Sequence, residues 1–369
     1  MRILFIYNVS YFFCLHRLHL AKKLIKDGHD VWLICKIESE EDRELLWKSG
    51  VKLSEMTMSR GFKYAFKDIK SWFDLRKLIK EIGPDLTEVA TVKPIVVGGL
   101  IFIMNRMKVV YWLPGLGYIF TSQSKVVKGL RFILMKIYKM IFMLSDCKVI
   151  LENSEDRDFL IAKGVLPTSD SFVLSGSCVT VEEYSHEREP REFKVALISR
   201  MLWNKGIGEY IDAIRIFRKN PYISCEFLLV GMTDDNPTSI PVENIKQWVK
   251  EGLITYTGFV KDVRRIYEDV NIVCLPSHRE GLPKVIVEAG ASTRASIVTN
   301  VPGCREIIRD GFNGKIVTVG DPKDLANSIE FLLTNEATRL RMAKNARQYV
   351  EEKFSTETFY QSIEKIYFR

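Results

Sequence analysis

The stretch Ile272-Val-Cys-Leu-Pro-Ser-His-Arg-Glu280-Gly-Leu-Pro-Lys-Val-Ile-Val-Glu288-Ala-Gly290 combines a strand, a turn and the beginning of a helix. Its first four residues are apolar and predict a buried strand, while Gly281 and Pro283 mark the turn and the first helical residues. Glu280 and Glu288 could accept hydrogen bonds from sugar hydroxyls at both ends of an extended ligand. Two glutamates at this spacing are equally compatible with the exposed face of a helix.

Strands and helices alternate on both sides of this stretch. This βαβ order predicts parallel sheets with right-handed crossovers, in which ligands bind at the carboxyl ends of the strands. Strands are expected at Ile3–Tyr7, Val31–Cys35, Leu86–Ala90, Val109–Trp112, Cys147–Leu151, Phe193–Ser199, Glu226–Val230, Ile254–Thr257 and Ser296–Thr299. Helices are expected up to Lys26, over Asp68–Glu81 and Gly208–Phe217, from Pro283, and from Asp324 onward.

A charged run with a proline and no periodic apolar face interrupts the pattern at 182–192 and predicts a domain linker. The expected fold is therefore α/β, with two Rossmann-like domains facing across a cleft. Residues 1–181 would form the first domain and residues 193–350 the second. Residues 351–369 would form a C-terminal helix that packs back on the first domain.

The composition argues against several other classes of protein. The seven cysteines form no CxxC pair, so we expect buried thiols in a reducing compartment rather than a zinc or redox site. Met1 is followed by a short strand-like run, and we expect no signal peptide. The apolar stretches Ile95–Met104 and Phe132–Leu144 are too short or too interrupted by lysines to cross a bilayer.

The positive charge is concentrated in the first half of the chain. Residues 1–180 hold 27 Lys and Arg against 19 Asp and Glu, and the whole chain has a net charge of +8. A one-sided basic surplus indicates a polyanionic partner.

The segment Lys125–Leu144 interleaves cations with large apolar residues, as does a helix that lies on an anionic membrane surface. A core helix with a basic outer face is the alternative. A nucleic-acid-binding protein is a further alternative, but no recognition motif appears and the second domain would have no purpose.

Four further motifs accompany the glutamate pair. They are Ser199-Arg200-Met-Leu-Trp-Asn-Lys205-Gly206, Gly258-Phe259-Val260-Lys-Asp-Val, Gly115-Leu-Gly117 and Glu152-Asn153-Ser-Glu-Asp-Arg157-Asp-Phe159. Together with the E-x7-E element they resemble the large retaining glycosyltransferase family 4, which has the GT-B fold. The closer likeness is to bacterial capsule and O-antigen transferases that extend undecaprenyl-diphosphate-linked sugars, and it runs over almost the whole chain. It implies that residues 1–181 form an acceptor- and membrane-facing domain and residues 193–350 a nucleotide-sugar-binding domain.

The resemblance implies a role for each matching residue of the donor site. Arg200 and Lys205 would clamp the donor diphosphate and stabilise the charge that the leaving nucleoside diphosphate gains, so no obligatory metal or other cofactor is expected. Glu280 would hold hydroxyls of the donor sugar, and Glu288 would accept from the ribose. The remaining donor residues would be Gly281, Leu282 and Pro283, whose backbone faces the phosphates, and Phe259 and Val260, which lie near the nucleobase.

The acceptor side departs from the commoner family pattern. The loop after the first strand, Asn8–Arg17, lacks the glycine pair of many relatives, so a phosphate cradle made by this loop alone is not expected. His16 and Arg17 could instead meet the acceptor diphosphate, and Lys93 follows the strand that ends near Ala90. A structural histidine and a plain surface lysine are the alternatives. Asp234-Asp235 could hold Mg²⁺, but the following Asn236-Pro237 predicts an ordinary loop.

The expected activity is transfer of a hexose, favoured as N-acetylgalactosamine or N-acetylglucosamine, from its UDP-sugar to a polyprenyl-diphosphate-linked glycan. UDP-galactose and UDP-glucose are the next candidates. Retention normally uses a carboxylate nucleophile, and the resemblance assigns Glu280 to binding, so we expect front-face attack with the departing phosphate taking the proton. A GT-B-fold UDP-sugar 2-epimerase, which needs no lipid acceptor, is the alternative enzyme. The expected location is cytoplasmic, peripheral on the inner membrane.

Overall fold

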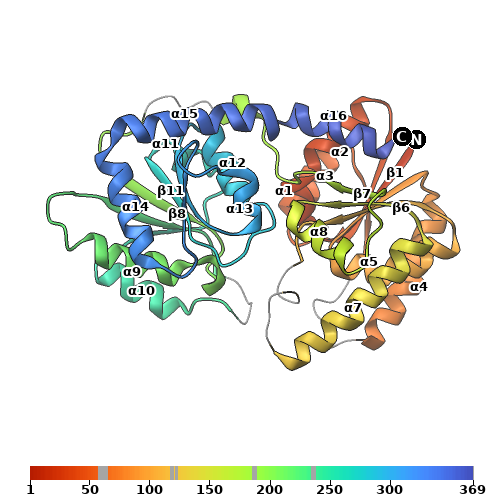
Figure 1. Cartoon of the computed structure of the whole chain (residues 1–369). Coiled ribbons are helices and arrows are strands. Elements are labelled where there is room, and N and C mark those ends of the chain that lie inside the picture. The colour runs from red at the N-terminus through yellow and green to blue at the C-terminus, as the bar shows by residue number, and fades with distance from the viewer. Residues whose placement is uncertain (57–64, 117–119, 121–123, 185–188, 234–237, 369) are drawn as a thin grey trace. The chain divides into compact units, whose positions relative to one another are not determined.

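The computed structural model describes residues 1–56, 65–116, 120, 124–184, 189–233 and 238–368, with only the backbone for 65–70. The chain forms two compact units (Figure 1). The first unit comprises Met1–Gly176 together with Tyr360–Arg369, and the second unit comprises Ser177–Phe359. The division therefore falls before the predicted linker at 182–192. The chain returns to the first unit within its last helix.

The first unit is built on a seven-stranded sheet in the order β3-β2-β1-β4-β5-β6-β7, with all strand pairs parallel. This is the doubly wound order, in which the strand sequence reverses at β1. Its strands are β1 (Arg2–Val9), β2 (Asp30–Lys36), β3 (Lys52–Glu55), β4 (Leu86–Ala90), β5 (Lys108–Leu113), β6 (Asp146–Leu151) and β7 (Ser171–Val173).

Helices cover both faces of this sheet (Figure 1). One hydrophobic cluster lies between the sheet and helices α4, α5 and α7, and includes Leu4, Ile6, Val89 and Tyr111 from the strands. The helices are α1 (Ser10–His16), α2 (Leu18–Lys26), α3 (Glu40–Lys48), α4 (Ala65–Ile82), α5 (Val92–Met104), α7 (Lys125–Leu144), α8 (Ser154–Ala162) and the last helix, α16 (Thr356–Tyr367).

The second unit has a six-stranded parallel sheet in the order β10-β9-β8-β11-β12-β13. Its strands are β8 (Lys194–Ile198), β9 (Glu226–Val230), β10 (Thr255–Gly258), β11 (Ile272–Leu275), β12 (Ala295–Thr299) and β13 (Lys315–Val317). The α-helices are α9 (Ile207–Phe217), α10 (Val242–Lys250), α11 (Arg264–Glu268), α12 (Lys284–Ala291), α13 (Pro302–Ile307), α14 (Pro322–Thr334) and α15 (Glu336–Lys353); two 3₁₀ turns are η2 (Val181–Tyr184) and η3 (Trp203–Lys205).

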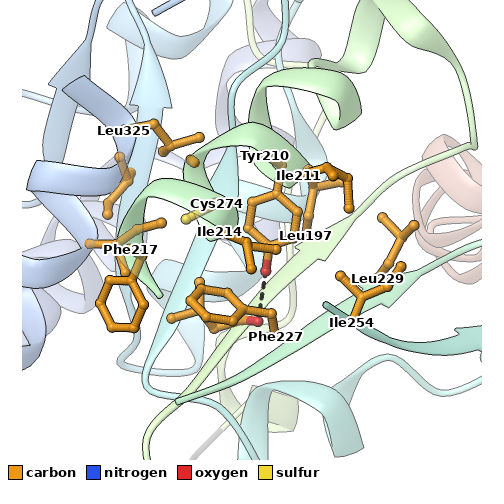
Figure 2. Close-up of a cluster of buried hydrophobic side chains, with 14 of the residues drawn as sticks. Leu197, Tyr210, Ile211, Ile214, Phe217, Phe227, Leu229, Ile254, Cys274 and Leu325 are labelled. Atoms are coloured by element: carbon orange, nitrogen blue, oxygen red, sulfur yellow. Dashed lines mark hydrogen bonds between the residues drawn. The ribbon is translucent and has the colours of Figure 1, made fainter. Parts of the chain in front are cut away.

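Successive residues of the central strands enter different cores. In β8, Val195 and Leu197 belong to one hydrophobic cluster and Ala196 to another, because side chains alternate across a strand. Both faces of the sheet are covered, so both sets are apolar, which is the reason these strands have continuous hydrophobic sequences. Figure 2 shows the first of these clusters, in which the Tyr210 hydroxyl donates to the backbone carbonyl of Val195 at 2.9 Å.

Most predicted elements are present, with bounds that shift by a residue or two. The predicted first helix is two helices, α1 and α2, because the chain breaks at Arg17 (φ −131°, ψ −14°). The short strands β3, β7 and β13 were not predicted. All three are outermost strands of their sheets and contain only three or four residues. Among the described residues, none of the helices is both long and apolar enough to cross a membrane.

Candidate functional site

The predicted donor residues gather at the carboxyl ends of the strands of the second unit's sheet. All its strands are parallel, so these ends lie together along one border of the sheet. Arg200 follows β8, Phe259 follows β10, and Glu280 lies in the loop between β11 and α12. Arg200 is exposed, and the side chain of Phe259 is 58% exposed, so both are available to a ligand there.

The structure brings Lys205 and Glu280 together from segments 75 residues apart. The Lys205 ammonium lies 2.6 Å from Glu280 Oε1, and their side chains are only 19% and 10% exposed. This is a close, partly desolvated ion pair of the kind that holds its geometry better than a surface pair. The cation predicted for the diphosphate and the carboxylate predicted for the sugar are therefore immediate neighbours.

Backbone contacts hold the Glu280 loop against the Lys205 segment. The backbone N–H of His278 donates to the Asn204 carbonyl at 3.0 Å. Gly206 has φ +74°, and a Cβ there would lie 1.9 Å from the Pro276 carbonyl oxygen, so only glycine permits this approach. The side chains add a second contact, because Glu209 Oε1 lies 2.7 Å from His278 Nε2. Sequence patterns gave no sign of the pairing between Glu209 and His278.

Further hydrogen bonds hold the backbone of the Glu280 loop at Glu280 and Leu282. The N–H of Gly303, in α13, donates to the Glu280 carbonyl at 3.3 Å, and the buried Ser177 hydroxyl donates to the Leu282 carbonyl at 3.1 Å. Leu282 and Pro283 are buried, Gly281 is partly exposed, and Pro283 stands as the residue before the first helical residue of α12. The loop that carries Glu280 is thus positioned on both sides before any ligand binds.

Glu288 lies in α12 and is buried, with 8% of its surface exposed. Its carboxylate accepts hydrogen bonds from the hydroxyls of Tyr267 at 2.9 Å and Tyr184 at 3.2 Å. Burial raises the pKa of Glu288, while Lys284 and the two hydroxyls act in the opposite direction. A ribose would have to share this carboxylate with the tyrosines or displace one of them, and the predicted ribose contact stays a prediction.

Arg17 requires a revision of the predicted acceptor site. Its side chain is buried, with 1% of the residue exposed. The guanidinium Nε donates to Glu88 Oε1 at 3.0 Å, and the group lies 3.6 Å from the ring centroid of Trp112. Because a buried cation must be paired, Glu88 explains why Arg17 is inside the first unit rather than at a surface open to an acceptor.

Glu88 is the centre of a buried polar cluster. Besides Arg17, the hydroxyls of Tyr7 and Tyr367 donate to its carboxylate, so β1, β4 and α16 meet there. Beside it, Glu152 accepts from the indole N–H of Trp112 at 3.1 Å. Burial raises the pKa of Glu152 to about 8, against the opposing effect of Arg17. This shift favours the neutral form of Glu152, which limits the negative charge in this interior.

The other predicted residues have different positions. His16 ends α1 and is half-buried, with its ring 4.5 Å from that of Phe12. Lys93 is half-buried in the first turn of α5, which follows β4, the neighbour of β1. Val260 packs against the second unit's core. Asp234 and Asp235 lie outside the described residues, and within those residues no three acidic, histidine or cysteine side chains form a metal cluster.

Comparisons with known proteins match both halves of the chain. The model described as "Glycosyl transferase 4-like" matches residues 2–150, and that described as "Glycosyl transferases group 1" matches residues 192–335. An N,N'-diacetylbacillosaminyl-diphospho-undecaprenol alpha-1,3-N-acetylgalactosaminyltransferase of Campylobacter jejuni is 27% identical over 343 residues, covering 88% of each chain. The capsular polysaccharide biosynthesis glycosyltransferase CapM of Staphylococcus aureus is 25% identical over 316 residues, covering 82% of this chain and 81% of its own.

Among solved structures, Anabaena HepE in complex with UDP and glucose superposes with a TM-score of 0.81 at 20% identity, over 99% of this chain and 98% of that one. At this identity the likeness shows the fold, which is GT-B as predicted. The two family models match separate halves that agree with the two parallel-sheet units. The chain therefore belongs to the glycosyltransferases of group 1 and the 4-like type, and it is a hexosyltransferase with the GT-B fold.

Proposed function

We propose that this enzyme transfers an N-acetylhexosamine, with retention, from a UDP-sugar to an undecaprenyl-diphosphate-linked saccharide in the assembly of O-antigen or capsule. The contact between Lys205 and Glu280 carries the proposal, because it brings a cation that could bind a diphosphate next to a carboxylate that could accept from a sugar hydroxyl. The relatives from Campylobacter jejuni and Staphylococcus aureus support the acceptor class, since the first is named for an undecaprenol-linked acceptor and the second for capsule synthesis.

The proposed chemistry uses the charges of Arg200 and Lys205. As the bond between the sugar and the diphosphate breaks, negative charge grows on the leaving phosphate, and two nearby cations stabilise it without a metal. The UDP-sugar is then a substrate and no cofactor is required. Glu280 would accept from a sugar hydroxyl while it keeps its contact with Lys205, because a carboxylate has lone pairs for several donors.

The stereochemical part of the proposal is front-face attack. A double displacement needs a free carboxylate on the far face of the sugar. Glu280 is the carboxylate that the resemblance assigns to the donor sugar, and its Oε1 is already paired with the Lys205 ammonium, which makes it a weak nucleophile. We therefore assign the acceptor hydroxyl as the attacking group and the departing phosphate as the group that takes its proton.

The acceptor binds the first unit in this proposal. His16 and Lys93 are the predicted acceptor residues that are partly exposed, whereas Arg17 is buried and paired with Glu88. An acceptor held in a bilayer by its polyprenyl chain requires the enzyme to work at the anionic cytoplasmic surface of the inner membrane. The excess of Lys and Arg in residues 1–180 supports this location.

The decisive experiment incubates purified protein with a panel of UDP-sugars and short-chain polyprenyl-diphosphate glycans and identifies products by mass. Addition of one N-acetylhexosamine to the glycan is expected, with the anomeric configuration of the donor retained when the product is analysed by NMR. Conversion of a UDP-sugar to its epimer in the absence of any acceptor would replace this proposal with the 2-epimerase. Transfer from UDP-galactose or UDP-glucose alone would keep the reaction and correct the donor.

A further inference from the structure

Helix α7 in the first unit exposes an unusual number of large apolar side chains. Its inner side is fixed, because Leu134, Tyr138, Ile141 and Phe142 are buried against the core. Phe142, which belongs to the segment that the sequence predicted as a membrane-surface helix, is therefore a core residue. The exposed apolar residues of α7 are Val126, Leu130, Phe132, Ile133, Met140, Met143 and Leu144, of which Val126 (73%), Phe132 (64%) and Leu144 (62%) are exposed over most of their surface.

Five of these side chains form a continuous stripe, while Phe132 and Met143 lie beside it on the side that carries the lysines. Val126, Leu130, Ile133, Met140 and Leu144 recur at intervals of three, four or seven residues, the spacing that keeps side chains on one side of a helix. The half-buried Ile137 fills the interval between Ile133 and Met140. Exposed lysines border the stripe at positions 125, 128, 136 and 139. A 20-residue helix extends for about 30 Å, so the stripe is long enough to contact many lipid headgroups.

Helix α5, a neighbour of α7, also exposes large apolar residues. It packs closely against α7, because a Cβ on Gly99 would lie 2.4 Å from Ile141 Cδ1. Its own outer residues Leu100 (50%) and Met104 (61%) are exposed, and so is Phe73 (60%) on α4, which packs against α5. We call the exposed apolar residues and bordering lysines of α7, with Leu100 and Met104 of α5, the α5–α7 face.

The charges decide which partner fits the α5–α7 face. No acidic residue occurs between Lys125 and Leu144, so a second copy packed on α7 would bring lysines together without ion pairs. A nucleic acid would neutralise the lysines but leave the apolar stripe in contact with a charged backbone. An anionic bilayer satisfies both, because lysine ammonium groups reach the phosphates while their methylene chains and the apolar side chains enter the acyl boundary.

We propose that the α5–α7 face lies flat on an anionic lipid bilayer, with Phe132, Ile133 and Leu144 inserted and the four lysines at the level of the phosphates. The proposal rests on the proposed function, which requires a membrane-held acceptor, and it identifies the surface that meets the membrane. Catalysis on a water-soluble acceptor does not need this surface, so the two can fail separately.

The first test measures co-sedimentation with vesicles of phosphatidylcholine, with and without phosphatidylglycerol. Replacing Lys125, Lys128, Lys136 and Lys139 by Gln should weaken binding to the anionic vesicles by roughly ten-fold or more at low salt. The matched control replaces four exposed lysines of the second unit, Lys219, Lys246, Lys250 and Lys323, and changes the net charge equally. Equal loss in both variants would show that only total charge matters and would overturn the assignment of this face.

The second test removes three of the most exposed apolar side chains of α7, two from the stripe and Phe132 from beside it. Phe132→Ser, Ile133→Ser and Leu144→Ser together should abolish binding that survives high salt, whereas Val249→Ser, Phe331→Ser and Tyr222→Ser, at exposed positions of the second unit, should not. Both variants should keep wild-type transfer to a short water-soluble acceptor, which checks folding and the proposed function independently. If the α7 variant binds vesicles like the wild type, or changes the native mass of the lipid-free protein instead, the face is not the membrane surface.

Discussion

The contact between Lys205 and Glu280 is the most informative single feature of the proposed donor site. It joins a cation that follows β8 to a carboxylate that follows β11, and β8 and β11 are neighbouring strands. Gly206 makes the contact possible by bringing the backbone of the two loops together. An ammonium held in this way is already partly desolvated and oriented, and such preorganisation is what stabilises charge that develops during a reaction.

Loss of either donor-site cation should slow the reaction with little effect on folding. Arg200→Ala and Lys205→Ala are each expected to lower kcat by about two to three orders of magnitude, the usual scale for one preorganised charge stabiliser. Lys219→Ala, at an exposed position just beyond α9, is the matched control. Turnover within a few-fold of wild type in either site variant, measured with saturating donor, would remove that residue from the diphosphate site.

Activity should survive chelation if these cations do the work of a metal. Treatment with EDTA is expected to change the initial rate by no more than a few-fold, since a guanidinium and an ammonium offset the diphosphate charge. Complete loss of transfer with EDTA, and its recovery with Mn²⁺ or Mg²⁺, would direct attention back to Asp234 and Asp235 as metal ligands.

Glu152 should give the first unit a pH-dependent stability. Burial raises its folded pKa to about 8 from an ordinary value of 4.5, so above the ordinary value the folded state binds more protons than the unfolded state. The free energy of unfolding should therefore fall as pH rises across this window. Glu152→Gln should flatten that decline, as measured by urea denaturation at several pH values. An unchanged slope in the variant would assign the pH dependence to other groups.

At the scale of elements, the last helix is anchored by one buried hydroxyl. Tyr367 in α16 donates to Glu88 in β4, whereas Tyr360 in the same helix donates to the His19 carbonyl at a half-buried position. Lys148 supports the anchor by donating to the Ile366 carbonyl at 2.7 Å. Since Glu88 also pairs with Arg17, the end of α16 is tied to the buried cluster of the first unit.

Removal of that hydroxyl should loosen α16. Tyr367→Phe is expected to destabilise the first unit by about 1 to 3 kcal/mol, because a buried carboxylate oxygen loses its donor. Tyr360→Phe makes the same chemical change on the same helix and should cost less, since water can replace its bond. Hydrogen exchange of the α16 amides compares the two variants. Equal exchange rates would mean that apolar packing alone holds the helix.

At the scale of the whole molecule, the charge is divided unequally between the halves of the chain. Residues 1–180 contain eight more basic than acidic residues, whereas residues 181–369 contain 27 of each. If the acceptor is presented on an anionic bilayer, this imbalance brings the enzyme to its substrate. The attraction is screened over about 8 Å at physiological ionic strength, so it responds to salt.

Salt should therefore separate delivery of the acceptor from the chemical step. For the wild-type enzyme, raising the ionic strength is expected to slow transfer to a long-chain lipid acceptor in anionic vesicles, and to change transfer to a short water-soluble acceptor much less. The ratio of the two rates is the measurement. A parallel decline of both rates would indicate that salt acts at the donor diphosphate.

Much of the fold, and the gathering of the motif residues at the carboxyl ends of the second unit's strands, could be predicted from the sequence. Buried strands of a doubly covered parallel sheet have continuous apolar sequences, so β1, β4, β8, β9 and β11 were recognisable. The donor motifs follow strand ends directly, and in a parallel sheet those ends share an edge. The short strands near the sheet edges and the break at Arg17 were missed, because three or four residues carry little pattern and a helix break depends on what the side chain meets.

The sequence by itself determined two doubly wound parallel-sheet units, because local apolar patterns mark their strands and helices. It also determined that Arg200, Lys205 and Glu280 follow strand ends, because these residues come directly after recognisable strands. Only the tertiary structure decided that Arg17 is buried and paired with Glu88, 71 residues away. The same holds for the hydrogen bonds that Tyr184 and Tyr267 donate to the carboxylate of Glu288. It also decided which side of α7 is exposed. The physical reason is that pairing and burial of a side chain depend on groups distant in the sequence, which meet only after the chain has folded.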